Sequence, residues 1–291
     1  MFVVGILNDN KMASNILKEY EDREIKGHYY FDQASNAYVI AVEDEAYLPI
    51  ALDIYRVKLG LKKPIELDQE WLKIKTIPRG KVTTKIIIFC VIIYLFSYLS
   101  IGKGLYDLLF IDGHQSGFLT DFYKGQFWRL LTPIFLHMGF FHILFNMLWI
   151  NDLGRIFEYK FTTKKYLLFI IVTGIFSNCL QYFFKGPSFG GMSGVLYGLL
   201  SFLWINKKLN PEFEFSLPKH DTIMMILWFF LCLFGIFPNV ANFAHAGGIV
   251  IGILGAIALN FQFSLDRLKY FGYAIFVLMI TIVVEKYNLH F

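Results

Sequence analysis

Apolar residues gather in long runs from residue 86 onward, and short polar segments separate the runs. Six runs recur at spacings suited to membrane helices, and a seventh follows them: 86–102, 139–157, 166–184, 193–206, 222–237, 243–263 and 270–284. A helix needs about 20 apolar residues to cross about 30 Å of hydrocarbon, so the shorter runs are expected to extend by several positions. The pattern predicts an all-α polytopic membrane protein.

Residues 1–62 are mixed in polarity and predict a small α+β soluble domain. The expected elements are a strand at 2–7, a helix at 11–20, a hairpin of strands at 29–32 and 38–42, and a helix at 45–59. Prolines and lysines mark residues 63–83 as a linker to the membrane core at 84–264. Residues 265–291 are expected to hold an extra membrane helix and the C-terminus.

Composition and charge agree with a membrane protein whose N-terminus is cytoplasmic. The chain is 56% hydrophobic and 19% aromatic, which exceeds the content of an ordinary soluble domain. With a cytoplasmic N-terminus, lysines and arginines concentrate in the inside segments, such as Lys207 and Lys208, whereas residues 238–242 on the outside carry none.

A serine and a histidine stand out within the apolar part of the chain. Ser193 lies in the segment Gly190-Gly191-Met192-Ser193-Gly194, and His245 lies in Ala244-His245-Ala246-Gly247-Gly248. Polar groups are costly in hydrocarbon, so their retention suggests chemistry inside the bilayer. A serine hydroxyl is a weak nucleophile, and an imidazole that accepts its proton would activate it.

Three further polar residues fall at the same predicted end of the bundle: His142, Asn146 and Tyr197. The first two are four residues apart, as are Ser193 and Tyr197, so each pair shares a helix face. His142 and Asn146, with the backbone N–H of Ser193, are the donors expected to stabilise an oxyanion. No acidic residue lies within a turn of His245 in sequence, which predicts a Ser-His dyad whose imidazole packs against Tyr197.

These segments, together with Phe127-Trp128-Arg129 and the stretch from His137 to Asn146, resemble the motif set of the rhomboid intramembrane serine proteases, in the same order. The likeness covers residues 84–264, is greatest to the bacterial GlpG type, and extends more loosely to the N-terminal domain. It implies a rhomboid-like core bundle of six transmembrane helices, here with a seventh C-terminal helix.

The resemblance also implies roles for individual residues. Ser193 matches the nucleophile, His245 the general base, and His142 and Asn146 the oxyanion-stabilising side chains. Gly191 matches the glycine that lets the loop approach the intermediate, Tyr197 matches the ring stacked on the histidine, and Glu158 matches a structural acid. His137 is expected to line the water-accessible mouth.

The resemblance further implies the substrates and the location of the protein. Single-pass membrane proteins would be cut in or near their transmembrane segment. The expected place is a bacterial inner membrane, with the site opening toward the periplasmic side. The expected partners are transmembrane protein substrates and the lipid bilayer, with no nucleic acid.

No metal and no cofactor are expected. His137 and His142 are five residues apart and have no third ligand at a suitable spacing. The three cysteines, Cys90, Cys179 and Cys232, fall singly in different apolar runs, with neither disulfide nor zinc spacing.

Two other functional classes are compatible with such a chain. A rhomboid-like protein that binds membrane clients without cutting them would share the fold, but it would be expected to lack the nucleophile or the base. A small-solute transporter also tolerates intramembrane histidine and asparagine, but it should show an internal repeat, and none is detected between the halves.

Overall fold

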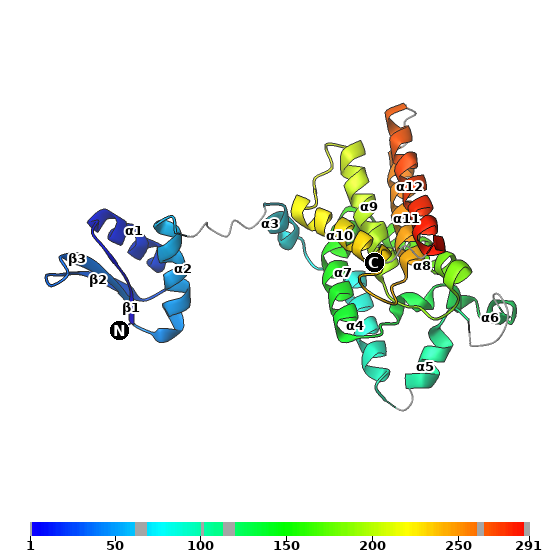
Figure 1. Ribbon diagram of the computed structural model, residues 1–291, viewed down its shortest axis with the longest axis horizontal. Helices are drawn as coiled ribbons and strands as arrows, with labels where there is room; N and C mark the ends of the chain where they lie inside the picture. The colour runs from blue at the N-terminus through cyan, green and yellow to red at the C-terminus, as the bar shows by residue number, and fades with distance from the viewer. Residues whose placement is uncertain (1, 62–68, 100–101, 113–119, 261–264, 288–291) are drawn as a thin grey trace. The chain divides into compact units, whose positions relative to one another are not determined.

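The computed structural model describes residues 2–61, 69–99, 102–112, 120–260 and 265–287. The chain divides into two compact units, Met1–Leu67 and Asp68–Phe291 (Figure 1). Each unit has its own apolar core.

The first unit is a three-stranded antiparallel sheet with two helices. Its elements are β1 (Phe2–Leu7), α1 (Asn10–Glu21), β2 (Gly27–Asp32), β3 (Ala37–Val42), a 3₁₀ turn (Glu45–Tyr47) and α2 (Leu48–Lys58). The strand order is β1-β3-β2, which places the most buried strand, β3, in the centre. The predicted strands and helices are confirmed, and the second predicted helix begins as the 3₁₀ turn.

Local interactions explain where these elements begin and end. The Asp9 carboxylate accepts a hydrogen bond from the backbone N–H of Lys11 and caps α1. Between β2 and β3, Asp32 accepts from the backbone N–H groups of Ala34 and Ser35, and Asn36 adopts a positive φ of 51°. These bonds close the hairpin in the register that pairs Asp32 with Ala37.

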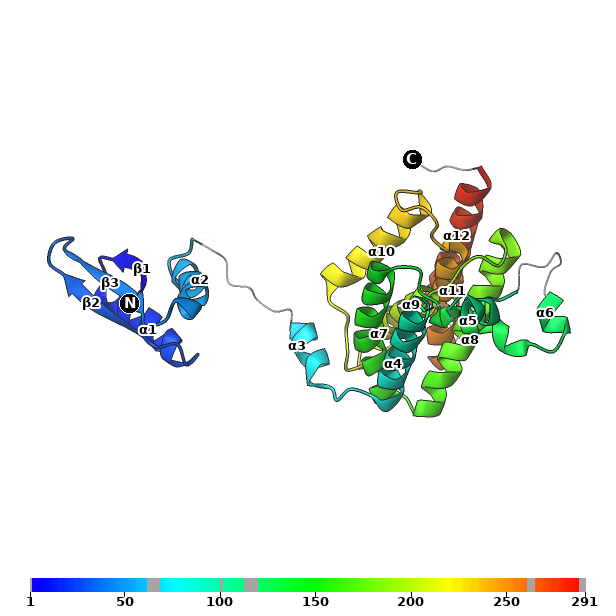
Figure 2. The ribbon, with the colours of Figure 1, turned by 90° about the horizontal axis from the view of Figure 1, so that it is seen from below.

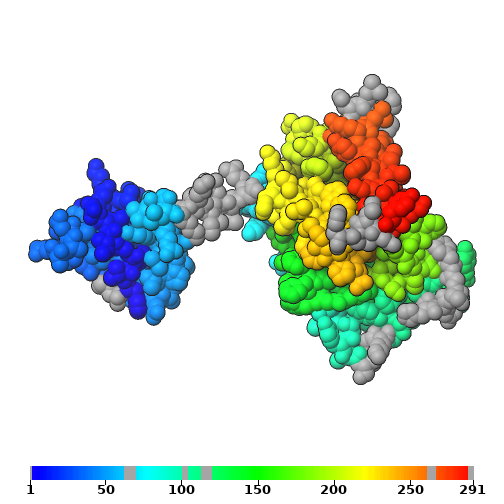
Figure 3. Space-filling view, viewed as in Figure 1, coloured from blue at the N-terminus to red at the C-terminus, as the bar shows by residue number. Residues whose placement is uncertain are grey.

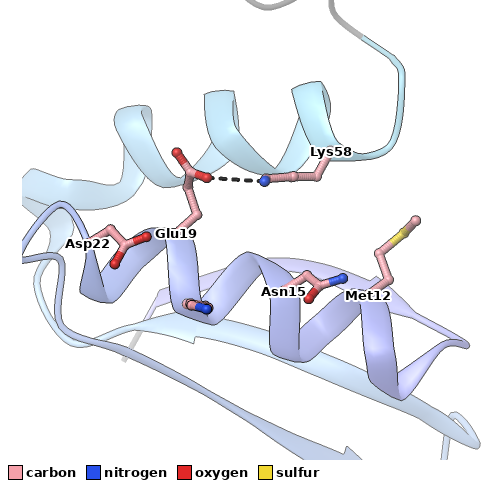
Figure 4. A pocket seen from close by; sticks show the side chains of 6 residues that line it. Met12, Asn15, Glu19, Asp22 and Lys58 are labelled. Carbon is pink, nitrogen blue, oxygen red and sulfur yellow. Dashed lines mark ion pairs between the residues drawn. The ribbon is translucent and has the colours of Figure 1, made fainter.

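The two helices of the first unit also contact one another. The buried Tyr20 hydroxyl of α1 donates to the carbonyl oxygen of Ala51 in α2 at 2.9 Å. At the surface, Lys58 and Glu19 form an ion pair of 3.1 Å at the rim of a polar hollow (Figure 4). The carboxylate of Glu19 also accepts from Arg23, and these cations lower the pKa of Glu19.

The second unit is a helical bundle. Its long helices are α4 (Lys81–Phe96), α7 (Phe140–Lys160), α8 (Thr163–Lys185), α9 (Ser193–Leu209), α10 (Lys219–Leu233), α11 (Asn242–Leu259) and α12 (Leu265–Tyr287). Short helices precede or connect them: α3 (Gln69–Thr76), α5 (Gly102–Leu109), α6 (Thr120–Tyr123), and 3₁₀ turns at Phe127–Leu130 and Thr132–Phe135. Figure 2 shows α9 within the bundle, where all but a few of its residues are buried.

The bundle has the surface of an integral membrane protein. Among the described residues, three stretches are long and apolar enough to cross a membrane, Thr163–Lys185, Asn242–Leu259 and Arg267–Tyr287, each with a mean hydropathy of 1.8. Large apolar side chains such as Phe141, Leu148, Ile223 and Phe276 are more than half exposed on the outer helices. Such residues are stable there because lipid replaces the missing protein neighbours.

Every predicted membrane helix is present, with shifted ends. The largest shift is in the first helix, predicted at 86–102 and found at Lys81–Phe96. Its polar first turn is helical because the Glu158 carboxylate accepts from the backbone N–H groups of Val82 and Thr83, at 2.8 and 2.9 Å. The helix predicted at 222–237 begins at Lys219 and ends at Leu233, and the last one extends over Leu265–Tyr287 rather than 270–284.

The short helices were not predicted from the sequence. α3 lies inside the region predicted as a linker, and its Ile74 is fully buried in the core of the second unit. The loop after α4 contains α5 and α6, which Arg129 organises: the buried guanidinium donates to the carbonyl oxygens of Asp107 and Phe110. A charged side chain thus supplies the hydrogen bonds that end α5.

Candidate active site

Ser193 and His245 lie side by side although 52 residues separate them in the sequence. The Nε2 atom of His245 is 2.8 Å from the Oγ atom of Ser193. Ser193 is the first residue of α9 and is half-buried, whereas His245 lies in the first turn of α11 and is 5% exposed. The hydroxyl and the imidazole predicted to react together are therefore in direct hydrogen-bond contact.

Glycines bring the two helices to this distance. A Cβ atom on Gly248 would overlap the carbonyl oxygen of Gly194, and one on Gly252 would overlap the Ser201 hydroxyl and the carbonyl oxygen of Gly198. The Ser201 hydroxyl also donates to the carbonyl oxygen of Ile249 at 3.1 Å. Small residues of α11 thus form its contact surface with α9.

The loop that leads into Ser193 is held in a conformation that requires glycine. Gly191 has a φ of +125°, and a Cβ atom there would lie 2.5 Å from the Nε2 atom of His142. Its backbone N–H donates to the carbonyl oxygen of Pro133 at 2.9 Å. The loop backbone and the His142 ring are therefore in close contact just before the N-terminus of α9.

His142 and Asn146 lie on one face of α7, as their spacing predicted. The Nδ2 atom of Asn146 donates to the carbonyl oxygen of His142 at 2.7 Å, one turn earlier in the helix. A primary amide has two N–H groups, so a second one remains for another acceptor. The Oδ1 atom of Asn146 is buried and has no hydrogen-bond partner among the described residues.

His137 is buried, and the expectation that it lines a water-accessible mouth is therefore not met. The residue is only 1% exposed, and its ring centroid lies 5.0 Å from the ring centroid of His142. Its Nδ1 atom is 3.2 Å from the carbonyl oxygen of Phe135, and its own carbonyl oxygen accepts from the Tyr106 hydroxyl. α5 covers this part of the loop, and the sequence did not predict α5.

Tyr197 contacts the imidazole of His245. The two ring centroids are 4.7 Å apart and the planes are tilted by 45°. The Tyr197 hydroxyl donates to the carbonyl oxygen of Met225 on α10 at 3.1 Å. The predicted packing of the ring against the histidine is present, with a tilted rather than a parallel geometry.

The imidazole of His245 makes no hydrogen bond through its other nitrogen. The Nδ1 atom is buried and has no partner among the described residues. For Nε2 to accept the Ser193 proton, the ring must carry its own proton on Nδ1. Among the described residues, the ring is held by its contacts with Tyr197 and Ser193, and no acidic side chain bonds to it.

One further polar residue of the site was not predicted. The Oε1 atom of Gln181, in α8, accepts from the backbone N–H groups of Phe243 and Ala244 at 3.0 and 3.3 Å. These N–H groups belong to the first turn of α11, where a helix offers no partners of its own. The sequence did contain a signal for this role, because Gln181 lies within the apolar run 166–184 and a buried amide must find a hydrogen-bond partner.

The described residues contain no cluster of three or more His, Cys, Asp and Glu side chains that could hold a metal ion. Near Ser193 lie the His245 imidazole, at 2.8 Å, and the His142 ring, which contacts the loop backbone at Gly191. Such a set suits acyl transfer, in which a hydroxyl attacks a carbonyl and donors stabilise the charge that develops on oxygen.

Comparison with known proteins agrees with this arrangement. Residues 124–262 match the Rhomboid domain family model. Proteins named Rhomboid protease GlpG from Yersinia pseudotuberculosis and Yersinia pestis are 34% identical over 178 residues, which is 61% of this chain and 62% of each relative. The protein of the same name from Yersinia enterocolitica is 33% identical over the same length.

The chain thus spans less than two thirds of the length of the curated relatives that it matches. The matched domain contains the segments that carry Ser193 and His245 as well as His142 and Asn146. Residues 124–262 therefore match a Rhomboid domain, and over 178 residues the chain is similar to the GlpG rhomboid proteases.

Proposed function

We propose that this protein is an intramembrane serine protease that hydrolyses peptide bonds in or near the transmembrane segment of single-pass membrane proteins. The single observation that carries the proposal is the 2.8 Å contact between His245 Nε2 and Ser193 Oγ inside an apolar bundle. The GlpG relatives, which are named as rhomboid proteases, support the same reaction.

In the first step of the proposed reaction, Ser193 Oγ attacks the carbonyl carbon of the scissile peptide bond. His245 Nε2 accepts the hydroxyl proton as the C–O bond forms, and the carbonyl oxygen becomes negatively charged. When the C–N bond breaks, the imidazolium returns this proton to the leaving amine. A water molecule then hydrolyses the acyl-enzyme by the same two steps.

The proposed oxyanion site consists of the backbone N–H of Ser193, the side-chain amide of Asn146 and a ring N–H of His142. Ser193 begins α9, so its backbone N–H has no partner within the helix and points out of the helix N-terminus. Donors held in place before the reaction stabilise the developing charge, and each is worth about 3 to 4 kcal/mol in comparable sites.

The remaining residues are proposed to support this geometry. Gly191 lets the loop backbone pass the His142 ring, and Tyr197 packs against the His245 imidazole. His137 is proposed to support the site by packing against His142. The N-terminus is proposed to lie in the cytoplasm of a bacterial cell, with the site near the opposite face of the inner membrane.

The proposal is tested by labelling the purified protein with a serine-reactive fluorophosphonate and by measuring cleavage of a single-span reporter protein in detergent micelles. We expect labelling and cleavage in the wild type, no labelling in Ser193→Ala, and a loss of at least about a thousandfold in His245→Ala. Ser188→Ala is the matched control and should label and cleave as the wild type does, because that serine is exposed in the loop before α9. Labelling that persists in Ser193→Ala would exclude this nucleophile, and labelling without cleavage would favour a binding protein.

A further inference from the structure

α12 places a buried carboxylate against the beginning of the helix that carries His245. The side chain of Glu285 is 7% exposed. Its Oε1 atom accepts a hydrogen bond of 2.7 Å from Nδ2 of Asn242, and its Oε2 atom lies 2.5 Å from Nζ of Lys185 in α8. In the space-filling view, α12 (orange to red) borders α10 (yellow) on the face turned toward the viewer (Figure 3).

Asn242 connects three helices through one side chain. It is the first residue of α11, and its Nδ2 atom also lies 3.3 Å from the carbonyl oxygen of Cys232 near the end of α10. Asn242 precedes His245 by three residues, which is about one helical turn. A displacement of the Asn242 side chain therefore moves the turn of backbone on which the imidazole stands.

The position of that turn matters because the one polar contact of the imidazole among the described residues is with Ser193 Oγ, the group that it is proposed to activate. The Nδ1 atom of His245 lacks a partner among the described residues, so no acidic side chain corrects the ring position. The ring is set by its contact with Tyr197 and by the backbone of α11. A change of about 1 Å in the position of a catalytic group is enough to reduce a rate by about a hundredfold.

α8 and α12 hold this turn from two sides. On the α8 side, Gln181 accepts from two backbone N–H groups of the turn, and the Phe184 and Phe243 rings stack with centroids 4.2 Å apart. On the α12 side, the Glu285 carboxylate accepts a hydrogen bond from the Asn242 side chain, at the first residue of the turn. Lys185 neutralises the carboxylate, which reduces the cost of burying its charge.

We infer that Glu285 is a positioning residue for His245, and that it acts through Asn242. The inference rests on the proposed function for its catalytic consequence, but its structural consequence is independent of any activity. α12 is then more than a membrane anchor added to the bundle: it holds the active-site turn of α11 in place. The hydrogen bond to Asn242 performs this role, and the ion pair with Lys185 makes the buried carboxylate tolerable.

Four variants of the full-length protein separate these contributions. Glu285→Ala removes the hydrogen bond with Asn242 and the ion pair with Lys185. Glu285→Gln keeps an oxygen that accepts from Asn242 but loses the charge. Lys185→Met removes only the ion pair. Lys286→Ala is the matched control on the same turn of α12, because that side chain is exposed and contacts the ring of its neighbour Tyr287.

The first readout is cleavage of the single-span reporter, with kcat calculated per fluorophosphonate-reactive site so that unfolded protein is not counted. We expect kcat to fall at least about tenfold in Glu285→Ala with KM changed by less than about threefold, because substrate binding is unaffected and the base is misplaced. Glu285→Gln and Lys185→Met should retain kcat within about threefold, and Lys286→Ala should match the wild type. A purely structural role would lower the melting temperature and leave kcat per active site unchanged, which would overturn the inference.

The second readout needs no activity. Amide hydrogen exchange of residues 243–245 should be faster in Glu285→Ala than in the wild type and unchanged in Lys286→Ala. Only the first variant removes the hydrogen bond that Asn242 donates to Glu285. If the wild type neither labels nor cleaves, the proposed function fails while faster exchange still supports the positioning role. Equal exchange in all variants would overturn the inference even if the protein proves to be a protease.

Discussion

At the scale of single residues, the site depends on an imidazole that is held by packing. An N–H group buried without a partner costs about 1 to 3 kcal/mol, and the Nδ1 atom of His245 is in that situation when Nε2 accepts from Ser193. The folded bundle offsets this cost through the contacts of α9 with α11. The arrangement leaves the contact between Ser193 and His245 sensitive to any change that shifts either helix or the loop before Ser193.

Gly191→Ala tests that sensitivity at the loop. The substitution places a Cβ atom 2.5 Å from His142 Nε2 at a φ of +125°, so we expect the ring to move and fluorophosphonate labelling of Ser193 to slow by about a hundredfold. Gly186→Ala is the matched control, since Gly186 also has a positive φ but a Cβ atom there would meet no other atom within 4 Å. Equal labelling rates in the two variants would show that contact with His142 is unimportant.

At the scale of secondary-structure elements, the seam between α9 and α11 sets the distance between hydroxyl and imidazole. Gly248→Ala introduces a Cβ atom that overlaps the carbonyl oxygen of Gly194, and such overpacking costs about 1 to 3 kcal/mol. Because the helices must separate, we expect reporter cleavage to fall by about a hundredfold together with a lower melting temperature.

The control for this seam is Gly272→Ala in α12, where a Cβ atom would have no neighbour within 4 Å. Alanine is the better helix former by up to about 1 kcal/mol, so this variant should be as active as the wild type and no less stable. Full cleavage by Gly248→Ala would contradict the assignment of the seam as the element that sets the distance between Ser193 and His245.

The beginning of α4 depends on a single carboxylate from α7. Glu158→Ala leaves the backbone N–H groups of Val82 and Thr83 without their acceptor, which should cost about 1 to 3 kcal/mol and lower the melting temperature by several degrees. The exposed Glu212 is the matched control, and Glu212→Ala should change stability by less than about 0.5 kcal/mol. A melting temperature unchanged in Glu158→Ala would mean that water replaces the carboxylate.

The long helices were predictable because their apolar runs are nearly as long as the helices themselves. The ends of these helices were less predictable. Capping groups such as Glu158 come from other helices and leave no signal in the sequence near the helix end. The pairing of Ser193 with His245 was predictable from the shared end of the bundle and from the resemblance to the rhomboid motif set. Gln181 was missed because its role depends on a tertiary contact with the first turn of α11. The short α3 and α5 carry mixed polarity and too few turns for a clear period.

At the scale of the whole molecule, the chain is two folding units with separate cores. The first unit has a core of about ten buried side chains from one sheet and two helices, which is near the lower limit for independent folding. A loss of about 1 kcal/mol is therefore a large part of its stability. The second unit has a much larger core, so the same loss has a smaller effect on its folded fraction.

Tyr20→Phe tests whether the two units are energetically separate. It removes the buried hydrogen bond from the Tyr20 hydroxyl to the Ala51 carbonyl oxygen, which is worth about 1 kcal/mol. We expect amide hydrogen exchange in the cores of α1 and β3 to become about fivefold faster, because opening of the first unit becomes that much more frequent.

The exchange of α9 and α11, and the labelling of Ser193, should be the same in Tyr20→Phe and the wild type, because the lost bond belongs to the other core. Tyr30→Phe is the matched control, since Tyr30 lies on β2 and is 45% exposed. It should leave exchange in both units unchanged. Faster exchange of α11 in Tyr20→Phe would show instead that the stability of the first unit is transmitted to the turn that carries His245.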